Sequence, residues 1–183
     1  MKKIIVATLL AVCCLGTFLH AQSVTYLLDY EGIPGSSVIK GYENKIEVLS
    51  YSHGVSRTVS SSSGGGSART VGAPEVGEMS IFMALDTKAN VELTRAAFTG
   101  QGKLIKLIGL LNQGDAAPRK FLEIELTEGL ISSLTQEGSN GNQVYLNLSL
   151  NFLRIKFTTI PVDPRTGQPG TPVSFSYDLE KRN

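Results

Sequence analysis

Alternation of apolar and polar residues is the feature that most restricts the fold of this chain, and residues 144–157 show it most clearly. The apolar positions of one phase are Val144, Leu146, Leu148, Leu150 and Phe152, and those of the opposite phase are Leu153, Ile155 and Phe157. A period of two places successive side chains on opposite faces of a β-strand. The buried face therefore switches near Phe152, as a β-bulge or a crossing between two sheets would require.

The same period of two recurs along the chain and predicts further strands. These strands cover residues 24–31, 46–52, 78–85, 121–134 and 173–180. Residues 103–111 are apolar without clear alternation, and periodicity alone leaves strand and helix open; we favour a strand because β-branched residues stand between glycine-containing ends. Residues 138–141, GSNG, predict a hairpin turn.

A single short helix is predicted between two of these strands. Asp86 or Thr87 would cap it, it would run to about Phe98, and Gly100 and Gly102 would close it. Its apolar residues suffice to pack it against a sheet. Roughly eight strands, one helix and turn signals between them predict a mainly β fold, either an antiparallel β-barrel or a two-sheet sandwich with one short packed helix.

The first residues predict a secretory signal peptide spanning residues 1–21. Lys2 and Lys3 precede an apolar run over residues 4–19, and a small-residue exit ends at Ala21. The run is shorter than the ~20 residues that a transmembrane helix needs. We therefore expect residues 22–183 to be one mature domain, secreted or periplasmic, with no membrane insertion after cleavage.

Cys13 and Cys14 raise the alternative of a lipoprotein signal, but Val12 stands where such signals usually carry Gly, Ala or Ser, so we favour simple cleavage. Cleavage removes both cysteines. It also removes two lysines, which takes the formal charge from +1 to −1. A near-neutral chain without a basic cluster provides no electrostatic reason to expect nucleic acid or an anionic membrane as a partner.

Candidates for catalysis are few. His53 is the only histidine beyond the signal segment, and without cysteines a metal site of imidazole and thiolate ligands is not expected. A Ser-His-Asp arrangement lacks a Gly-x-Ser-x-Gly elbow, so we favour a structural, hydrogen-bonding role for His53. Glu123, Glu125 and Glu128 could suggest acid and base carboxylates, but two of them share the more polar face of a strand, where solvated or subunit-facing charges are expected.

The glycine-rich stretches also lack the marks of a nucleotide site. Neither residues 64–66 nor residues 138–141 contain Gly-Lys-Ser/Thr or stand between a strand and a helix. Phe82, Phe121, Phe152, Phe157 and Phe175 fall in apolar or alternating runs, as core residues do. We therefore expect no enzyme activity, no cofactor and no metal.

One segment has no side chain large enough to pack. It consists of Ser60, Ser61, Ser62, Ser63, Gly64, Gly65, Gly66 and Ser67. Such a segment cannot offset its own ordering entropy, so we expect a mobile loop in a free monomer. It is either a simple flexible linker or a loop that becomes ordered against a neighbouring subunit.

Two segments carry a resemblance to a known family. They are IEVLSYSHGVSR at residues 46–57 and DPRTGQPGTPVSFSYDLEKRN at residues 163–183, with GIPGSS at 32–37 and FLEIELTEGLISSLTQEGSNG at 121–141 in the expected order. The chain thereby resembles the haemolysin-coregulated protein (Hcp) family, which builds the inner tube of type VI secretion systems. The positions that carry the signature are Ile46, Glu47, Val48, Ser50, Tyr51, Ser52, His53, Gly54, Asp163, Thr166, Gly167, Asp178 and Leu179.

The resemblance implies a barrel of two sheets with the helix outside, six copies closing into a ring, and rings stacking into a tube that carries effectors. The implied partners are other copies of the chain, type VI sheath and spike proteins, and effectors. Residues 55–77 would form a loop that bridges subunits, and residues 163–170 would lie on a loop between strands.

Two features depart from typical members of the family. Typical members are cytoplasmic before type VI export and lack a signal peptide, whereas residues 1–21 would direct this chain through the general export route. Ser176 and Tyr177 also stand before Asp178 and Leu179 where members often show Gly-Trp. The alternative is an exported Hcp-like binding or surface module that does not act as a secretion tube.

Overall fold

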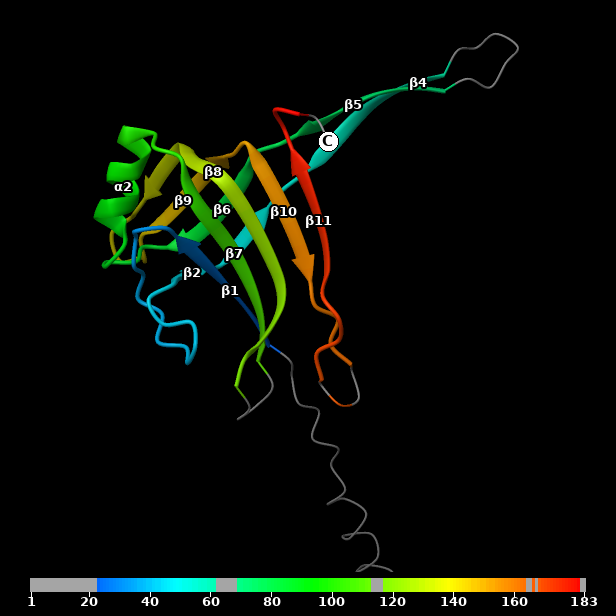
Figure 1. Ribbon diagram of the computed structural model, residues 1–183. Coiled ribbons are helices and arrows are strands. Elements are labelled where there is room, and N and C mark those ends of the chain that lie inside the picture. The colour runs from blue at the N-terminus through cyan, green and yellow to red at the C-terminus, as the bar shows by residue number, and fades with distance from the viewer. Residues whose placement is uncertain (1–22, 62–68, 113–116, 164–165, 167, 182–183) are drawn as a thin grey trace, which may run out of the picture.

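The computed structural model describes residues 23–61, 69–112, 117–163, 166 and 168–181 (Figure 1). The predicted signal peptide, residues 1–21, lies outside the described residues. So do residues 62–67 of the glycine- and serine-rich segment, and Gly167 of the signature. In the described part of the chain, no helix is long and apolar enough to cross a membrane.

Antiparallel strands dominate the structure, with one helix among the described residues. The elements are β1 (Ser23–Tyr30), β2 (Ile46–Val48), β3 (Ser50–Ser52), β4 (Val55–Ser61), β5 (Arg69–Val76), β6 (Met79–Ala84), α2 (Asn90–Thr99), β7 (Lys103–Asn112), β8 (Arg119–Glu137), β9 (Tyr145–Asn151), β10 (Arg154–Thr159) and β11 (Val173–Asp178). The predicted mainly β fold with one short helix is confirmed.

Two segments pass from one sheet to the other and close the barrel. β2 pairs with β1, whereas β3, which follows after Leu49, pairs with β6. The strand order is β2-β1-β7-β8-β9-β6-β3. Its first and last strands, β2 and β3, both belong to the continuous segment of residues 46–52. The second crossing segment is β8, whose first part pairs with β7 and β10 and whose later part pairs with β9. β2 and β3 stand at the two ends of this order, and the chain joins them through Leu49.

The bend in β8 lies at Glu128, which has a left-handed φ of 52°. Opposite this bend, the facing strand is interrupted at Phe152 and Leu153, between β9 and β10. Leu150, Phe152 and Ile155 are all buried, so the buried face switches near Phe152 as predicted. Leu153 is the exception to the predicted pattern, because it lies in the interruption and is 41% exposed.

The predicted strand over residues 103–111 is confirmed as β7, and its burial explains why it lacks alternation. Leu107 faces the main core of the barrel. Ile108 and Leu110 face the other way and form a second cluster with Leu27, which Ile39 covers from the loop after β1. Because both faces of β7 are covered over residues 107–111, this part of the strand is apolar on both faces.

The helix begins later than predicted. Asp86 does not cap it directly; instead its side chain accepts hydrogen bonds from the amides of Lys88 and Ala89, at 2.9 and 3.3 Å, in a turn that precedes α2. The carboxylate also accepts from the amide and hydroxyl of Ser36, at 2.8 and 2.9 Å, and so ties the loop after β1 to the helix. The helix ends at Gly100, as predicted, with a left-handed φ of 59°.

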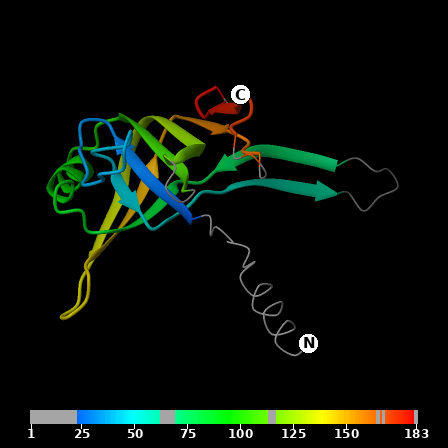
Figure 2. The same ribbon diagram turned by 90° about the horizontal axis from the view of Figure 1, so that it is seen from below.

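Within the range 55–77, the described residues 55–61 and 69–76 form two paired strands and not the loop that the resemblance implies. β4 and β5 pair antiparallel with each other and project from the barrel as a separate ribbon (Figures 1 and 2). Valines meet across the ribbon, Val55 with Val76 and Val59 with Val71, and β-branched residues favour extended backbone. Ser60 and Ser61 continue the ladder, so the strand pairing enters the segment expected to be a loop.

Candidate assembly surface

The projecting hairpin leaves several of its apolar side chains more than half exposed. Val55, Val59 and Val71 are 57%, 56% and 52% exposed. Among the described residues, β4 and β5 pair only with each other. A two-stranded ribbon in water is marginally stable on its own. Exposed valines on such a ribbon mark a surface that gains stability when a partner covers it.

The base of the hairpin is held by glycines. The amide of Gly77 donates a 2.9 Å hydrogen bond to the carbonyl oxygen of Gly54. A hollow of about 470 Å³ lies at this point. Its lining residues are Gly54, Val55, Ser56, Glu75, Val76 and Gly77. The hollow adds a concave surface beside the exposed valines.

His53 lies directly before the hairpin and packs between aromatic rings. Its ring centroid is 5.9 Å from that of Phe152 and 5.7 Å from that of Phe157. By distance and angle, neither of its nitrogens forms a hydrogen bond among the described residues. Burial lowers the pKa of His53, and the backbone of Gly77 opposes that shift in part. The side chain therefore packs against the rings of Phe152 and Phe157.

The last strand forms a second exposed apolar surface. β11 pairs with β10 along one edge, and among the described residues nothing pairs with its other edge. Val173 and Phe175 on this strand are 67% and 63% exposed. The prediction that Phe175 and Phe82 are core residues is therefore wrong; Phe82 is partly exposed and stacks on Tyr145 at 5.3 Å. An open edge with apolar side chains is a pairing site for another strand.

Two of the three acidic residues considered for catalysis are engaged in ion pairs. Glu123 contacts Lys120 at 2.7 Å, and Glu125 contacts Lys106 at 3.2 Å. Glu128 occupies the bend in β8. Within the described ranges, no three His, Cys, Asp or Glu side chains come together as a metal site would require.

Comparison with known families decides what kind of protein carries these surfaces. Residues 27–159 match the family model described as "Type VI secretion system effector, Hcp". The chain belongs to the Hcp family. Comparison with curated protein sequences finds no match.

Solved structures have the same fold as this Hcp-family chain. A structure described as that of a type six secretion system protein superposes with a TM-score of 0.80 at 19% identity, over 88% of this chain and 99% of its own. Hcp1 from Salmonella typhimurium gives a TM-score of 0.64 at 18% identity, over 87% and 96% of the two chains. A type VI secretion system effector from Yersinia pestis gives 0.62 at 19%, over 84% and 98%.

The structure places the first group of Hcp signature residues in and beside the barrel wall. Ile46 and Val48 are buried in the core, whereas Glu47, Ser50 and Ser52 face outward. Tyr51 packs edge-on against Tyr26, with ring centroids 5.1 Å apart.

The second group of signature residues lies around the last strand. As the resemblance implies, Asp163 and Thr166 lie on the loop between β10 and β11, where the Asp163 carboxylate accepts a 3.0 Å hydrogen bond from the Thr166 amide. Asp178 is paired with Arg154 at 2.9 Å, and Leu179 packs on the core. Strand β10 joins both groups, because Phe157 contacts His53 and Arg154 holds Asp178.

Proposed function

We propose that this Hcp-family protein is a structural subunit of a type VI secretion tube. Six copies would close into a ring, rings would stack, and the resulting tube would carry or chaperone effectors. The observation that supports this most directly is the β4–β5 hairpin, which extends beyond the barrel and exposes Val55, Val59 and Val71. A monomer gains nothing from such a ribbon, whereas a neighbouring subunit could cover it.

The open edge of β11 supports the same proposal. In a ring, each subunit uses one surface to contact a different surface of the next subunit. Each subunit therefore needs two complementary surfaces. The hairpin with the segment of residues 60–67 would supply one, and the edge that carries Val173 and Phe175 would supply the other. Sheath and spike proteins of type VI secretion and its effectors would be the further partners.

The alternative function is an exported Hcp-like binding or surface module. It is favoured by residues 1–21, whose basic start and apolar run have the layout of a signal peptide. In that case residues 22–183 would act in the periplasm or outside the cell. Mass spectrometry of the protein recovered from each compartment separates the two: a chain that begins at Gln22 favours the exported module, and an intact cytoplasmic chain favours the tube.

Light scattering during size exclusion, at several protein concentrations, tests the tube proposal. We expect a stable species of six times the monomer mass; a monomer at all concentrations would contradict the proposal. A variant that replaces residues 62–68 with Asn-Gly tests the segment at the tip, because a two-residue turn between the paired Ser61 and Arg69 preserves the hairpin register. A smaller oligomer with unchanged circular dichroism would show that the segment bridges subunits, and an unchanged oligomer would refute that role.

A further inference from the structure

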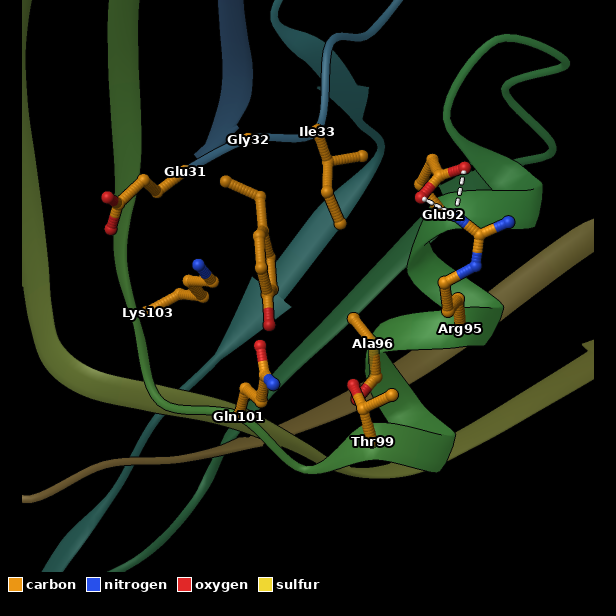
Figure 3. Close-up of a pocket in the computed structure, with 10 residues that line it drawn as sticks. Glu31, Gly32, Ile33, Glu92, Arg95, Ala96, Thr99, Gln101 and Lys103 are labelled. Atoms are coloured by element: carbon orange, nitrogen blue, oxygen red, sulfur yellow. Dashed lines mark hydrogen bonds and ion pairs between the residues drawn. The ribbon is translucent and has the colours of Figure 1, made fainter.

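A pocket of about 360 Å³ opens beside the helix, away from the hairpin (Figure 3). It lies between the end of β1 and the turn after it, one face of α2, and the segment that leads from α2 into β7. Ile33 and Ala96 contribute apolar walls, and Gln101 lines the same pocket (Figure 3). The volume suits a small ligand or the end of a peptide.

The two carboxylates of this pocket are already engaged. Both oxygens of Glu92 accept hydrogen bonds from Nη1 of Arg95, at 2.8 and 2.9 Å. Glu31 accepts a 3.0 Å hydrogen bond from the amide of Leu104 through Oε2. Of the two acids only Glu92 has a charged partner, and both make the pocket unfavourable for a ligand with two negative charges.

The groups that lack a partner are mostly donors. Tyr30 is only 2% exposed, and its buried hydroxyl has no hydrogen-bond partner among the described residues. Burial raises the pKa of Tyr30, so the hydroxyl keeps its proton and remains a donor. Gln101 and Lys103 line the same pocket, and in the described part of the chain Lys103 forms no ion pair. A buried hydroxyl without a protein partner is rare in folded proteins and is available to an acceptor such as a water molecule or a ligand oxygen.

We infer that this pocket binds a carboxylate carried on a short apolar body, such as the free C-terminus of a peptide or a short carboxylic acid. The phenol, the amide and the ammonium would donate to the carboxylate oxygens, and Ile33 and Ala96 would contact the apolar part. Glu31 and Glu92 disfavour phosphate. This binding activity is independent of ring formation, because no lining residue belongs to the hairpin or to β11.

Saturation-transfer NMR with the full chain tests the inference, using N-acetyl-alanyl-alanine as the probe. We expect a dissociation constant on the order of 1 mM and at least about tenfold weaker binding of the C-terminal amide. Propionate is the second probe: binding as tight as that of the dipeptide assigns the site to small free acids, and weaker binding assigns it to peptide ends. Equal binding of acid and amide, or tighter binding of inorganic phosphate, would overturn the inference.

Matched variants locate the site. Tyr30→Phe removes only the hydroxyl, and Lys103→Met removes only the charge; we expect each to weaken binding of the dipeptide about fivefold or more. Tyr145→Phe and Lys156→Met are the controls, because neither side chain lines the pocket. If both test variants bind as the unmodified protein does, the ligand lies elsewhere and the inference is wrong.

Discussion

Val59 and Val71 stand directly opposite each other across the β4–β5 hairpin, and both are more than half exposed. A cross-strand valine pair stabilises a ribbon through mutual contact. Its remaining surface stays in water in this chain. The two valines therefore stabilise the hairpin through their contact with each other, and their exposed surfaces offer an apolar contact to a partner.

Replacing both valines with glutamate should weaken the oligomer without unfolding the barrel. We expect Val59→Glu with Val71→Glu to raise the subunit dissociation constant roughly tenfold to a hundredfold, because two charges would be buried at the contact. Light scattering over a dilution series measures this change. Val38→Glu, at an exposed position on another loop, is the matched control. Equal assembly of the double variant and the control would exclude the hairpin from the interface.

Alternation predicted the barrel well where one face of a strand meets the core. The switch near Phe152 was visible because polar residues mark the outward positions of β9 and β10. β7 was harder, since Leu107 and Ile108 are buried on opposite faces and leave no period. The sequence does not show that Phe175 faces outward. Alternation identifies an apolar face of a strand, but it does not show whether this chain or another chain covers that face.

The remaining features depend on residues that are distant in the sequence. The sequence does not predict the hairpin, because small and polar residues separate its valines. The two strands do not pack on the core, so their apolar residues need not alternate with polar ones. The surroundings of His53 are not visible in the sequence, because Phe152 and Phe157, which pack against it, lie far from it along the chain. The pocket is equally hidden, because its lining residues Tyr30 and Gln101 come together only in the folded chain. Tyr30 alone is indistinguishable from an ordinary core residue.

His53 should make the protein less stable in mild acid. Its pKa in the folded state is lowered from the ordinary 6.5 by burial, so the unfolded chain takes up the proton first as the pH falls. No effect is expected above the unfolded pKa, and stability is lost progressively below it. Urea unfolding at pH 7.5 and pH 5.0 measures the loss, which should be smaller in His53→Phe. An equal loss in both proteins would show that His53 does not carry the effect.

Asp178 should hold the end of β11 only while it is charged. The hydrogen bonds from Arg154 are the main cause of its lowered pKa, and the amides of Glu180 and Lys181 also donate to its carboxylate. A lowered pKa adds stability above the unfolded value, and this stability is lost as the pH falls through the folded value. Asp178→Asn should lower the melting temperature by a few degrees at pH 6. The difference should shrink toward pH 3, and a constant difference would contradict the assignment.

Replacing each of two glycines with alanine should change the free energy of unfolding by different amounts, because only one of them lacks space for a side chain. A Cβ at Gly109 would lie 2.9 Å from two ring atoms of Phe121 and 3.0 Å from Cβ of Leu122, inside the paired strands β7 and β8. We expect Gly109→Ala to cost about 1–3 kcal/mol of unfolding free energy through overpacking. At Gly54 nothing lies within 4 Å, so Gly54→Ala should change stability by less than about 0.5 kcal/mol.

Urea unfolding of the two alanine variants measures both effects under one condition. If Gly54→Ala leaves the monomer intact but reduces the oligomer mass, the signature glycine is needed where a neighbouring subunit approaches the base of the hairpin. If Gly54→Ala unfolds the barrel as Gly109→Ala does, the glycine serves the fold of the single chain, and the base of the hairpin loses its part in the proposed assembly surface.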